Sequence, residues 1–480
     1  MSDALWSVAA MAQAMDAECV GALPAAISGL SIDSRTVSPG EAFFAIKGDS
    51  HDGHSFAAAA LKSGAGLAVV SRARSDIIPA PAPLLVVADV LAGLSALAHA
   101  ARARSAAKII AVTGSVGKTS TKEALRAALT ADGATHASVA SFNNHWGVPL
   151  SLARLPANAR YGIFEIGMNH AGEITPLTRL VRPHAAIVTA VEPVHLEFFD
   201  SIEAIADAKA EIFCGVESGG AAIINRDSAH YERLLRHAVE AGIDHLLSFG
   251  EHARADARLV TCVLDAEFSS VEADILGRRV SYRIGAPGRH FVLNSLAVLA
   301  AASFVGADLQ VAAGALADWK STIGRGSRLT LEMPEGAALL IDESYNANPT
   351  SMRAALALLA QAPVGPQGRR IAVLGDMLEL GPAGIDLHRG LSDVIRANGI
   401  DLVFCAGPLM QALWQALPSA TRGGYAESAE ALQADVIAAV RSGDAIMIKG
   451  SLGSKMGPMV KALIRARAKM GTPASEWVNH

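Results

Sequence analysis

A glycine-rich loop between an apolar run and a helix is the feature that most constrains this chain. The strand expected over residues 109–112 runs into Gly114 and Gly117, and Lys118 and Thr119 then open a helix-forming run. Strand, glycine turn, Lys-Thr and helix in this order make a P-loop, in which backbone N–H groups at the helix start cradle phosphate oxygens. The Lys118 ammonium can reach the β- and γ-phosphates, and the Thr119 hydroxyl can ligate Mg²⁺. The sequence therefore predicts a site for a nucleoside triphosphate.

The loop departs from the common P-loop pattern at its first position. Val112 stands five residues before the second loop glycine, where that pattern has a glycine. We interpret it as a variant P-loop, because both the strand before it and the helix after it are intact. The residues expected to hold the nucleotide phosphates are Thr113, Gly114, Ser115, Val116, Gly117, Lys118, Thr119 and Ser120.

The composition favours an α/β chain of several domains. Hydrophobic residues make up 51% of the chain and aromatic residues 5%, so aliphatic side chains must build the cores, as in proteins with buried parallel strands. A chain of this length favours about three domains. We predict a small α/β N-terminal domain at 1–105, a central P-loop domain with a parallel sheet at 106–326, and a C-terminal Rossmann-like domain at 327–480.

Charge and cysteine content exclude several classes of protein. The formal net charge of −5 is too small to indicate a nucleic-acid or membrane partner. The four cysteines are scattered without a C-x-x-C pair, which favours a reduced chain without structural zinc. No basic and apolar leader and no run of about 18–20 apolar residues is found, so we expect neither a secretion signal nor a membrane span. We expect a cytoplasmic protein that acts as a monomer.

Strand-like and helix-like runs alternate after the P-loop, which indicates mostly parallel sheets covered by helices. A more polar, β-rich stretch is expected at 246–284. The expected strands are 162–166, 185–191 and 221–225 in the central domain and 338–342, 370–374, 401–405 and 445–448 in the C-terminal domain. The expected helices are 56–63, 92–104, 291–304, 352–360 and 385–397.

Three ionisable residues in the central domain are candidates for metal chemistry. Glu165 lies in an apolar strand, where a carboxylate is costly unless it binds a metal or pairs with a charge. Beside a P-loop, Mg²⁺ is the natural partner, and an ion pair with Arg or Lys is the alternative. His195 follows the next strand and could ligate a second Mg²⁺ or order a phosphate. Lys209 lies on an amphipathic helix and by itself indicates no more than a surface or ion-paired lysine.

Two further features suit the rest of a nucleotide. Asn294 follows His290 by four residues, so on a helix the two share one face. An Asn amide offers both a donor and an acceptor, which suits an adenine edge. Arg325 lies between two glycines at the second domain boundary, where a guanidinium on a hinge suits a phosphate clamp that closes with domain motion.

Polar residues crowd the end of the first strand of the C-terminal domain. The run 341–351 holds Asp342, Tyr345, Asn346 and Asn348, and it opens a helix. In open α/β sheets the carboxyl ends of strands form ligand crevices, so we expect these side chains to line one. The run 374–381 at the next strand end is expected to belong to the same crevice.

In order and spacing these motifs resemble the Mur ligases, the ATP-dependent amino-acid and peptide ligases of peptidoglycan synthesis, over essentially the whole chain. The run Tyr345-Asn346-Ala347-Asn348-Pro349, with Gly375-Asp376-Met377 and Glu379-Leu380-Gly381, is typical of the member that adds a dipeptide. The Asp-Asn-Pro-Arg signature of the member that adds the third residue is missing. The resemblance therefore implies a UDP-linked muramoyl-tripeptide and D-alanyl-D-alanine as substrates, with the third peptide residue open between meso-diaminopimelate and lysine.

The resemblance also implies roles for individual residues. Catalysis would depend on Lys118, Lys209, His195 and Arg325, and Lys209 matches a lysine that this family carbamylates. The implied ligands of Mg²⁺, two ions in all, are Thr119, Glu165, His195 and Lys209. Besides the P-loop, ATP would be held by Asn294, Arg325 and Asp342. The implied substrate contacts are Ser34 and Arg35 for the uridine nucleotide, Asn143 and Asn144 for the muramoyl-peptide, and Tyr345, Asn346 and Asn348 for the dipeptide.

The implied reaction is phosphorylation of a carboxylate by ATP, followed by attack of the dipeptide amine on the acyl phosphate. Positioning and charge neutralisation would carry it, without a protein nucleophile. Two alternatives stay open at this point. A folylpolyglutamate-type ligase would share the last two domains, although the Asp-Ser-Arg run at 33–35 argues against it. A non-catalytic nucleotide-binding regulator is the other, and the intact Lys118 and Lys209 argue against that one.

Overall fold

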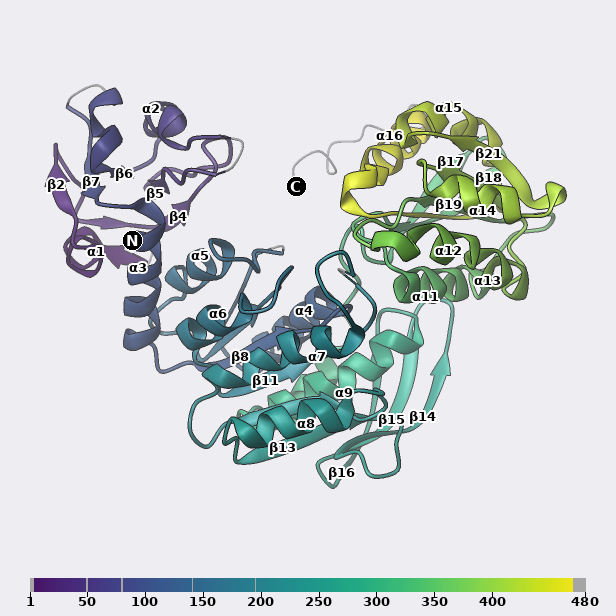
Figure 1. Ribbon diagram of the computed structural model, residues 1–480, viewed down its shortest axis with the longest axis horizontal. Helices are drawn as coiled ribbons and strands as arrows, with labels where there is room; N and C mark the ends of the chain where they lie inside the picture. Colours follow the sequence, from purple (N-terminus) through teal and green to yellow (C-terminus); the bar gives the residue numbers. More distant parts are fainter. Residues whose placement is uncertain (1–3, 49–50, 79–80, 140, 195, 469–480) are drawn as a thin grey trace.

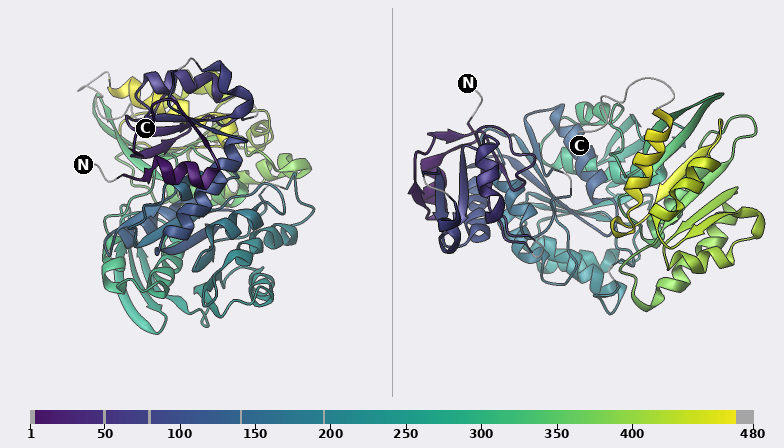
Figure 2. Two further views of the ribbon diagram at one scale, coloured as in Figure 1. Left: turned by 90° about the vertical axis from the view of Figure 1, so that its left-hand side faces the viewer. Right: turned by 90° about the horizontal axis from the view of Figure 1, so that it is seen from above.

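The computed structural model describes residues 4–48, 51–78, 81–139, 141–194 and 196–468. Three α/β domains, each built on its own sheet, follow one another along the chain (Figure 1). The N-terminal and C-terminal domains lie at opposite ends of the molecule, with the central domain between them (Figure 2). The predicted three-domain α/β architecture is therefore confirmed.

The N-terminal domain has a five-stranded sheet in the order β2-β7-β6-β5-β4, in which only the β2–β7 pair is antiparallel. Strands β1 and β3 form a separate antiparallel pair. The helix predicted at 92–104 begins two residues earlier. The elements are β1 (Trp6–Ser7), α1 (Val8–Met15), β2 (Glu18–Val20), β3 (Ala26–Ile27), β4 (Gly29–Ser31), β5 (Glu41–Phe44), α2 (His54–Lys62), β6 (Leu67–Ser71), β7 (Leu84–Val87) and α3 (Val90–Arg104).

The central domain has a nine-stranded sheet in the order β16-β15-β14-β13-β12-β11-β8-β10-β9. Strands β8 to β14 pair in parallel, and β14, β15 and β16 form an antiparallel meander at one edge. The elements are β8 (Lys108–Thr113), α4 (Lys118–Thr130), β9 (Thr135–Ala137), α5 (Gly147–Ala153), β10 (Tyr161–Glu165), α6 (Ile174–Val181), β11 (Ala185–Val188), α7 (Ile202–Ala210), β12 (Ala221–Asn225), α8 (Tyr231–Glu240), β13 (His245–Gly250), β14 (Ala257–Leu264), β15 (Ser269–Ile275), β16 (Arg278–Ile284), α9 (Arg289–Phe304) and α10 (Leu309–Ala315).

The P-loop strand shows why the central sheet is covered on both faces. Successive side chains of a strand point to opposite faces, and every residue of β8 after Lys108 is buried. Ile109 and Ala111 belong to the core that extends to the N-terminal domain, whereas Ile110 and Val112 pack in the core under α4 and α9. A strand buried on both faces reads as a continuous apolar run, which is how the sequence predicted it.

The C-terminal domain has a six-stranded sheet in the order β17-β18-β22-β19-β20-β21, parallel except for the β17–β18 hairpin. The single helix predicted at 385–397 is wrong, because the chain forms two helices that meet at Gly390. The elements are β17 (Ser327–Met333), β18 (Gly336–Glu343), α11 (Pro349–Ala360), β19 (Arg370–Gly375), α12 (Gly384–Arg389), α13 (Leu391–Ala397), β20 (Leu402–Ala406), α14 (Met410–Ala416), β21 (Arg422–Ala426), α15 (Ala429–Ala439), β22 (Ala445–Lys449) and α16 (Met456–Ala468).

The N-terminal domain is tied to the central domain by buried polar contacts. Trp6 Nε1 donates to the carbonyl of Ala153 at 2.9 Å, and the Arg104 guanidinium lies 3.3 Å from the Trp6 ring centroid. Arg102, also on α3, is buried and donates to the carbonyl of Val181 at 2.9 Å. The chain enters the C-terminal domain through the segment 324–326, in which glycines flank Arg325, and the hinge predicted there stays a prediction.

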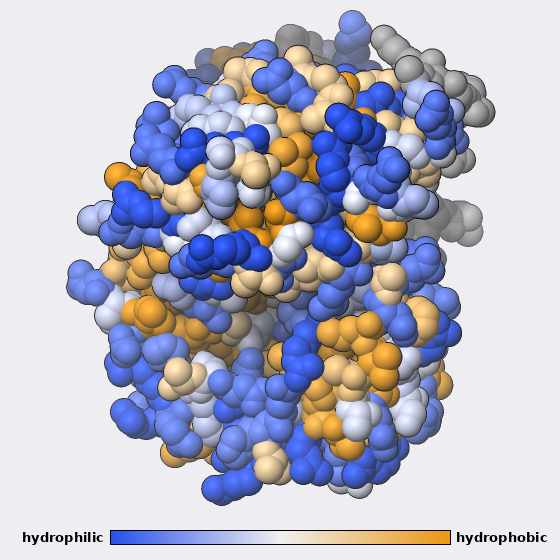
Figure 3. Space-filling view, turned by 90° about the vertical axis from the view of Figure 1, so that its right-hand side faces the viewer, coloured by the Kyte–Doolittle hydropathy of each residue, from blue (hydrophilic) through white to orange (hydrophobic). Residues whose placement is uncertain are grey.

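Figure 3 looks at the side formed by the C-terminal domain and the edge of the central sheet, and it shows hydrophilic side chains over most of this face with smaller hydrophobic patches between them. In the part of the chain that the structure describes, no helix is both long and apolar enough to cross a membrane.

Candidate active site

The P-loop takes the conformation that its glycines predict. Gly114 and Gly117 have φ values of +147° and +84°, which a residue with a Cβ rarely adopts. A Cβ at Gly117 would also lie 2.8 Å from Asn294 Nδ2, so α9 packs its amide directly on the loop. Lys118 Nζ folds back and donates to the carbonyl of Gly114 at 2.7 Å. Burial is the main cause that lowers the pKa of Lys118, and the charge of Arg325 lowers it further against the opposing effect of Glu165.

The end of the neighbouring strand β11 braces the loop from behind. Thr189 Oγ1 donates to the carbonyl of Val116 at 2.6 Å. The Ser115 backbone N–H donates to the carbonyl of Ala190 at 2.8 Å, and the Ser115 hydroxyl bonds both the N–H and the carbonyl of Glu192. The Thr113 hydroxyl is buried without a partner among the described residues. The hydrogen bonds from the end of β11 therefore hold the loop in its cradle shape.

Side-chain oxygens that could coordinate a metal lie close together where a P-loop Mg²⁺ would bind. Glu165 at the end of β10 is fully buried, and its two carboxylate oxygens accept hydrogen bonds from Thr119 Oγ1 at 2.8 Å and Asn143 Nδ2 at 2.7 Å. Ser141 Oγ lies 3.4 Å from the Thr119 hydroxyl. A hydroxyl and a carboxylate in contact at the helix start fit Mg²⁺, which takes few protein ligands and keeps waters and phosphate oxygens. The alternative of Glu165 as an ordinary ion-paired carboxylate is not what these contacts show.

Lys209 on α7 is not the surface lysine that its helix alone suggested. Its side chain is 2% exposed, and in the described parts of the chain its ammonium has no hydrogen-bond or ion-pair partner. Burial, assisted by the nearby charge of Lys118, holds the pKa of Lys209 well below its usual range. The neutral amine favoured in this way is the form that can react with CO₂. His195, the other predicted metal ligand of this region, lies outside the described residues.

Arg325 lines the same cleft as the P-loop. Arg325 Nη2 donates to Ser141 Oγ at 3.2 Å, and its guanidinium lies 4.2 Å from the centroid of the Tyr345 ring. The two contacts connect a loop of the central domain with the C-terminal domain. A second contact between these domains is the hydrogen bond from Thr350 Oγ1 to Glu192 Oε2, at 2.6 Å.

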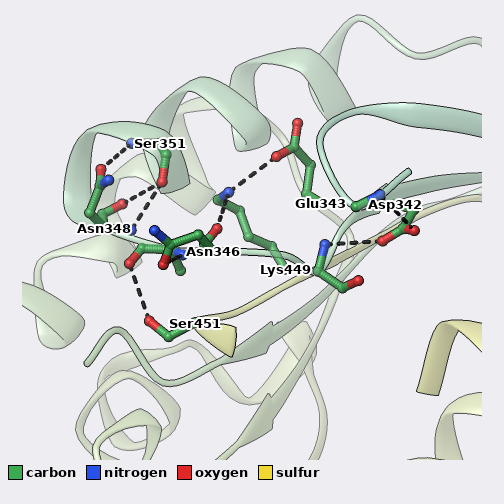
Figure 4. Close-up of polar contacts among 10 residues, drawn as sticks. Asp342, Glu343, Asn346, Asn348, Ser351, Lys449 and Ser451 are labelled. Carbon is green, nitrogen blue, oxygen red and sulfur yellow. Dashed lines mark hydrogen bonds and ion pairs between the residues drawn. The ribbon is translucent and has the colours of Figure 1, made fainter. Parts of the chain in front are cut away.

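Several side chains of the polar run at the end of β18 hold the backbone of the loop that follows (Figure 4). Asp342 is buried, and its carboxylate accepts the N–H groups of Gly324 and Ser344, both at 3.0 Å. Asn348 caps α11 by accepting the Ser351 N–H at 2.8 Å. The carboxylate of Asp342 thus holds the hinge, and its predicted contact with nucleotide stays a prediction.

One cleft of about 510 Å³ unites most of the predicted residues. It lies between the P-loop, α9, the hinge and the start of α11. The predicted site residues that line it are Ser115, Val116, Gly117, Lys118, Ser120, Asn143, Glu165, Asn294, Arg325, Tyr345, Asn346 and Asn348. Ser34, Arg35, Asn144, Asp342 and Lys209 are not among its lining residues, nor are Thr113, Gly114 and Thr119.

Some predicted residues make local contacts instead. The Arg35 guanidinium is exposed and forks onto Asp33 at 2.7–3.3 Å, and this hydrogen bonding lowers the pKa of the Asp33 carboxyl. Asn144 Oδ1 accepts the N–H of Gly147 at the start of α5. In the run 374–381, Asp376 accepts the N–H groups of Leu409 and Met410 at the start of α14. The expected uridine and muramoyl-peptide contacts stay predictions.

Sequence reasoning missed two charged residues in the cleft, the buried Lys449 and the partly buried Glu343, which form an ion pair. Lys449 ends the apolar run of β22 in the same way that Glu165 ends β10. A charge at the carboxyl end of an apolar strand therefore indicates a site residue for Lys449 as well as for Glu165.

Comparison with known proteins places these features in a family. Three family models match in order: "Mur ligase family, catalytic domain" over residues 26–104, "Mur ligase middle domain" over 112–302 and "Mur ligase, glutamate ligase domain" over 328–452. The UDP-N-acetylmuramoyl-tripeptide–D-alanyl-D-alanine ligase of Rickettsia prowazekii is 34% identical over 431 residues, 90% of this chain and 94% of that protein. The ligase of the same name from Escherichia coli is 34% identical over 443 residues, 91% and 94% of the two chains. The crystal structure of MurF from Acinetobacter baumannii has a TM-score of 0.81 and 28% identity, and it covers 96% of this chain and 99% of that chain.

Proposed function

Because this chain belongs to the Mur ligase family, whose members are ATP-dependent ligases that form amide bonds, we propose that it joins D-alanyl-D-alanine to UDP-N-acetylmuramoyl-tripeptide. The products are UDP-N-acetylmuramoyl-pentapeptide, ADP and phosphate, and the reaction supplies a precursor of peptidoglycan. The observation that carries the proposal is a cleft lined both by the P-loop and by the loop 345–348 of the C-terminal domain. Relatives named for this reaction match over nine-tenths of the chain.

The reaction divides into two displacements. A carboxylate oxygen of the tripeptide attacks the γ-phosphorus of ATP, and ADP leaves. The amine nitrogen of the dipeptide then attacks the acyl carbon of the acyl phosphate, and phosphate leaves as the amide forms and the nitrogen loses a proton. The protein contributes position and charge neutralisation, which are the main means of catalysing phosphoryl transfer.

The residues of the cleft have distinct tasks in this scheme. The P-loop amides and Lys118 bind the phosphates, once Lys118 Nζ exchanges the Gly114 carbonyl for a phosphate oxygen. Thr119 and Glu165 hold Mg²⁺, which when bound neutralises charge on the phosphoryl group. Arg325 approaches from the hinge, and Asn294 faces the adenine. Closure of the C-terminal domain excludes water that would hydrolyse the acyl phosphate.

Lys209 has a separate task, a carbamate at its Nζ. Carbamylation converts the neutral amine, with loss of a proton, into a carbamate anion, and with His195 this anion would hold a second Mg²⁺. The low pKa that burial imposes on Lys209 supports this proposal, because only the neutral amine reacts with CO₂.

The protein acts in the cytoplasm in this scheme, since the substrates ATP and UDP-peptides are cytoplasmic, and the expectation that it acts as a monomer stays a prediction. The folylpolyglutamate-type alternative is less favoured, because a Mur ligase domain also matches at 26–104.

Phosphate release from ATP tests the proposal, measured with the tripeptide containing meso-diaminopimelate or lysine, each with and without D-alanyl-D-alanine. We expect release to require both substrates and the pentapeptide product to be seen by mass spectrometry. The preferred tripeptide identifies the third residue. If D-alanyl-D-alanine does not stimulate release with either tripeptide, the proposed function is wrong.

A further inference from the structure

The end of strand β22 holds the loop that the proposed function places against the dipeptide. Lys449 is 2% exposed, and its Nζ donates to Glu343 Oε2 at 3.2 Å and to the carbonyl of Asn346 at 2.9 Å. Two residues later, Ser451 Oγ donates to the carbonyl of Ala347 at 3.2 Å. Two consecutive carbonyls of the loop are therefore held by side chains from one strand end, as Figure 4 shows.

Ser451 also binds a second loop, the one that follows β19. Its hydroxyl accepts the N–H of Leu378 at 3.0 Å, and its own N–H donates to the carbonyl of Asp376 at 3.0 Å. This is possible because β22 lies between β18 and β19 in the sheet, so its end sits between the loops that follow those two strands. The strand end thus connects both loops of the crevice.

The side chains of the held loop are available to a ligand. Asn346 Oδ1 accepts the N–H of Ala347 at 2.8 Å, and Asn348 Oδ1 accepts the N–H of Ser351 at 2.8 Å. Neither amide nitrogen has a hydrogen-bond partner within the described chain, although Asn348 is only 6% exposed and both residues line the cleft. Where these two NH₂ groups point depends on the backbone that Lys449 and Ser451 hold.

We propose that Lys449 and Ser451 are positioning residues for the acceptor dipeptide. They act through the backbone of Asn346 and Ala347, whose neighbouring amide side chains meet the ligand. Glu343 balances the buried charge of Lys449, which would otherwise be costly. The proposal rests on the proposed function, because that function places the dipeptide at this loop.

The test must separate two effects: the loss of the contact with the loop, and the cost of leaving a buried charge without a partner. Glu343→Gln removes the ion pair but keeps the donor to Asn346, whereas Lys449→Met/Glu343→Gln removes both charges and the donor. Ser451→Ala removes the second holding contact alone. Lys461→Met, an exposed lysine on α16, is the matched control.

Steady-state phosphate release is measured with ATP and D-alanyl-D-alanine varied in turn. We expect the dipeptide KM of Lys449→Met/Glu343→Gln to exceed that of Glu343→Gln by about tenfold, the effect of one hydrogen bond from a charged donor, with the ATP KM nearly unchanged. Ser451→Ala changes the same constant by a smaller factor, and Lys449→Arg recovers part of the loss. An unchanged dipeptide KM, or an equal rise in both KM values, would overturn the proposal.

Amide hydrogen exchange gives a readout that does not depend on activity. Peptides covering residues 345–351 should exchange faster in Lys449→Met/Glu343→Gln than in Glu343→Gln, with no change in Lys461→Met. Equal exchange in the two variants contradicts the positioning role. If D-alanyl-D-alanine does not stimulate phosphate release by the wild-type protein, the proposed function is wrong. Hydrogen exchange then still shows whether Lys449 holds the loop.

Discussion

Asparagine in place of Asp342 should loosen the hinge while keeping the shape of the side chain. Asp342 is 2% exposed, and each carboxylate oxygen accepts one backbone N–H at 3.0 Å, from Gly324 or from Ser344. Asparagine can keep one of these bonds, but its NH₂ group then faces the other N–H, so two buried donors lack an acceptor. Losing a bond to a charged acceptor and leaving a buried N–H unsatisfied costs roughly 2–4 kcal/mol.

Scanning calorimetry measures this cost. For a domain of roughly 150 residues, the midpoint of thermal unfolding of the C-terminal domain should fall by about 4–16 °C in Asp342→Asn. Asp393→Asn is the control, because that side chain on α13 is 77% exposed and we expect no comparable change. An unchanged midpoint together with a higher ATP KM would refute the hinge role and favour the contact with nucleotide that the family resemblance implied.

Three further perturbations test the central site and the domain contact. In CO₂-depleted buffer at pH 7, Lys209→Met should raise the thermal midpoint, because it removes an amine that burial penalises when charged. Since burial holds the folded pKa of Lys209 below its ordinary value of 10.5, wild type should gain stability relative to the variant as the pH rises toward that value, and a pH-independent difference would contradict this reason. In buffer that contains bicarbonate the same variant should lose turnover, because no carbamate can form. Thr119→Val keeps the side-chain shape but leaves Glu165 without its 2.8 Å donor, so kcat/KM should fall by about 10- to 100-fold and more Mg²⁺ should be needed for activity. If the variant depends on Mg²⁺ concentration as wild type does, Thr119 is not a ligand. Thr350→Val removes the 2.6 Å hydrogen bond to Glu192, so the equilibrium constant between closed and open domain arrangements should shift about tenfold toward the open one, with a larger radius of gyration in small-angle scattering. A scattering profile identical to that of wild type would show that this contact does not hold the domains together.

Local patterns predicted the parts of the fold whose cause is local. The apolar run 109–112 and the glycines after it specify a buried strand and a turn, and the structure has both. The run 221–225 coincides with β12. The edge strand β21, at 422–426, was not predicted, because its sequence Arg-Gly-Gly-Tyr-Ala has one strand-forming residue, Tyr425, beside two glycines, and among the described strands it pairs only with β20. The break at Gly390 had a local signal, because glycine is a poor helix former, but a single glycine does not by itself end a helix.

The functional site shows the same division. Glu165 could be selected from the sequence because a carboxylate in an apolar strand needs a partner, and the structure supplies that partner from α4. Asp342 was selected for the same kind of reason, but its partners are hinge amides. The residue type shows that a partner exists, and only the folded chain shows which one.

The sequence by itself determined the P-loop, the three α/β domains and the set of polar strand ends, because these depend on backbone propensities and on the alternation of apolar runs. It also carried the family resemblance. Tertiary structure alone decided the environment of Lys209, since burial of an amphipathic-helix lysine depends on what packs over it. It likewise decided the pairing of Lys449 with Glu343, two residues 106 positions apart that meet because β22 inserts beside β18. Contacts between distant segments follow from strand order, and strand order is a property of the folded sheet.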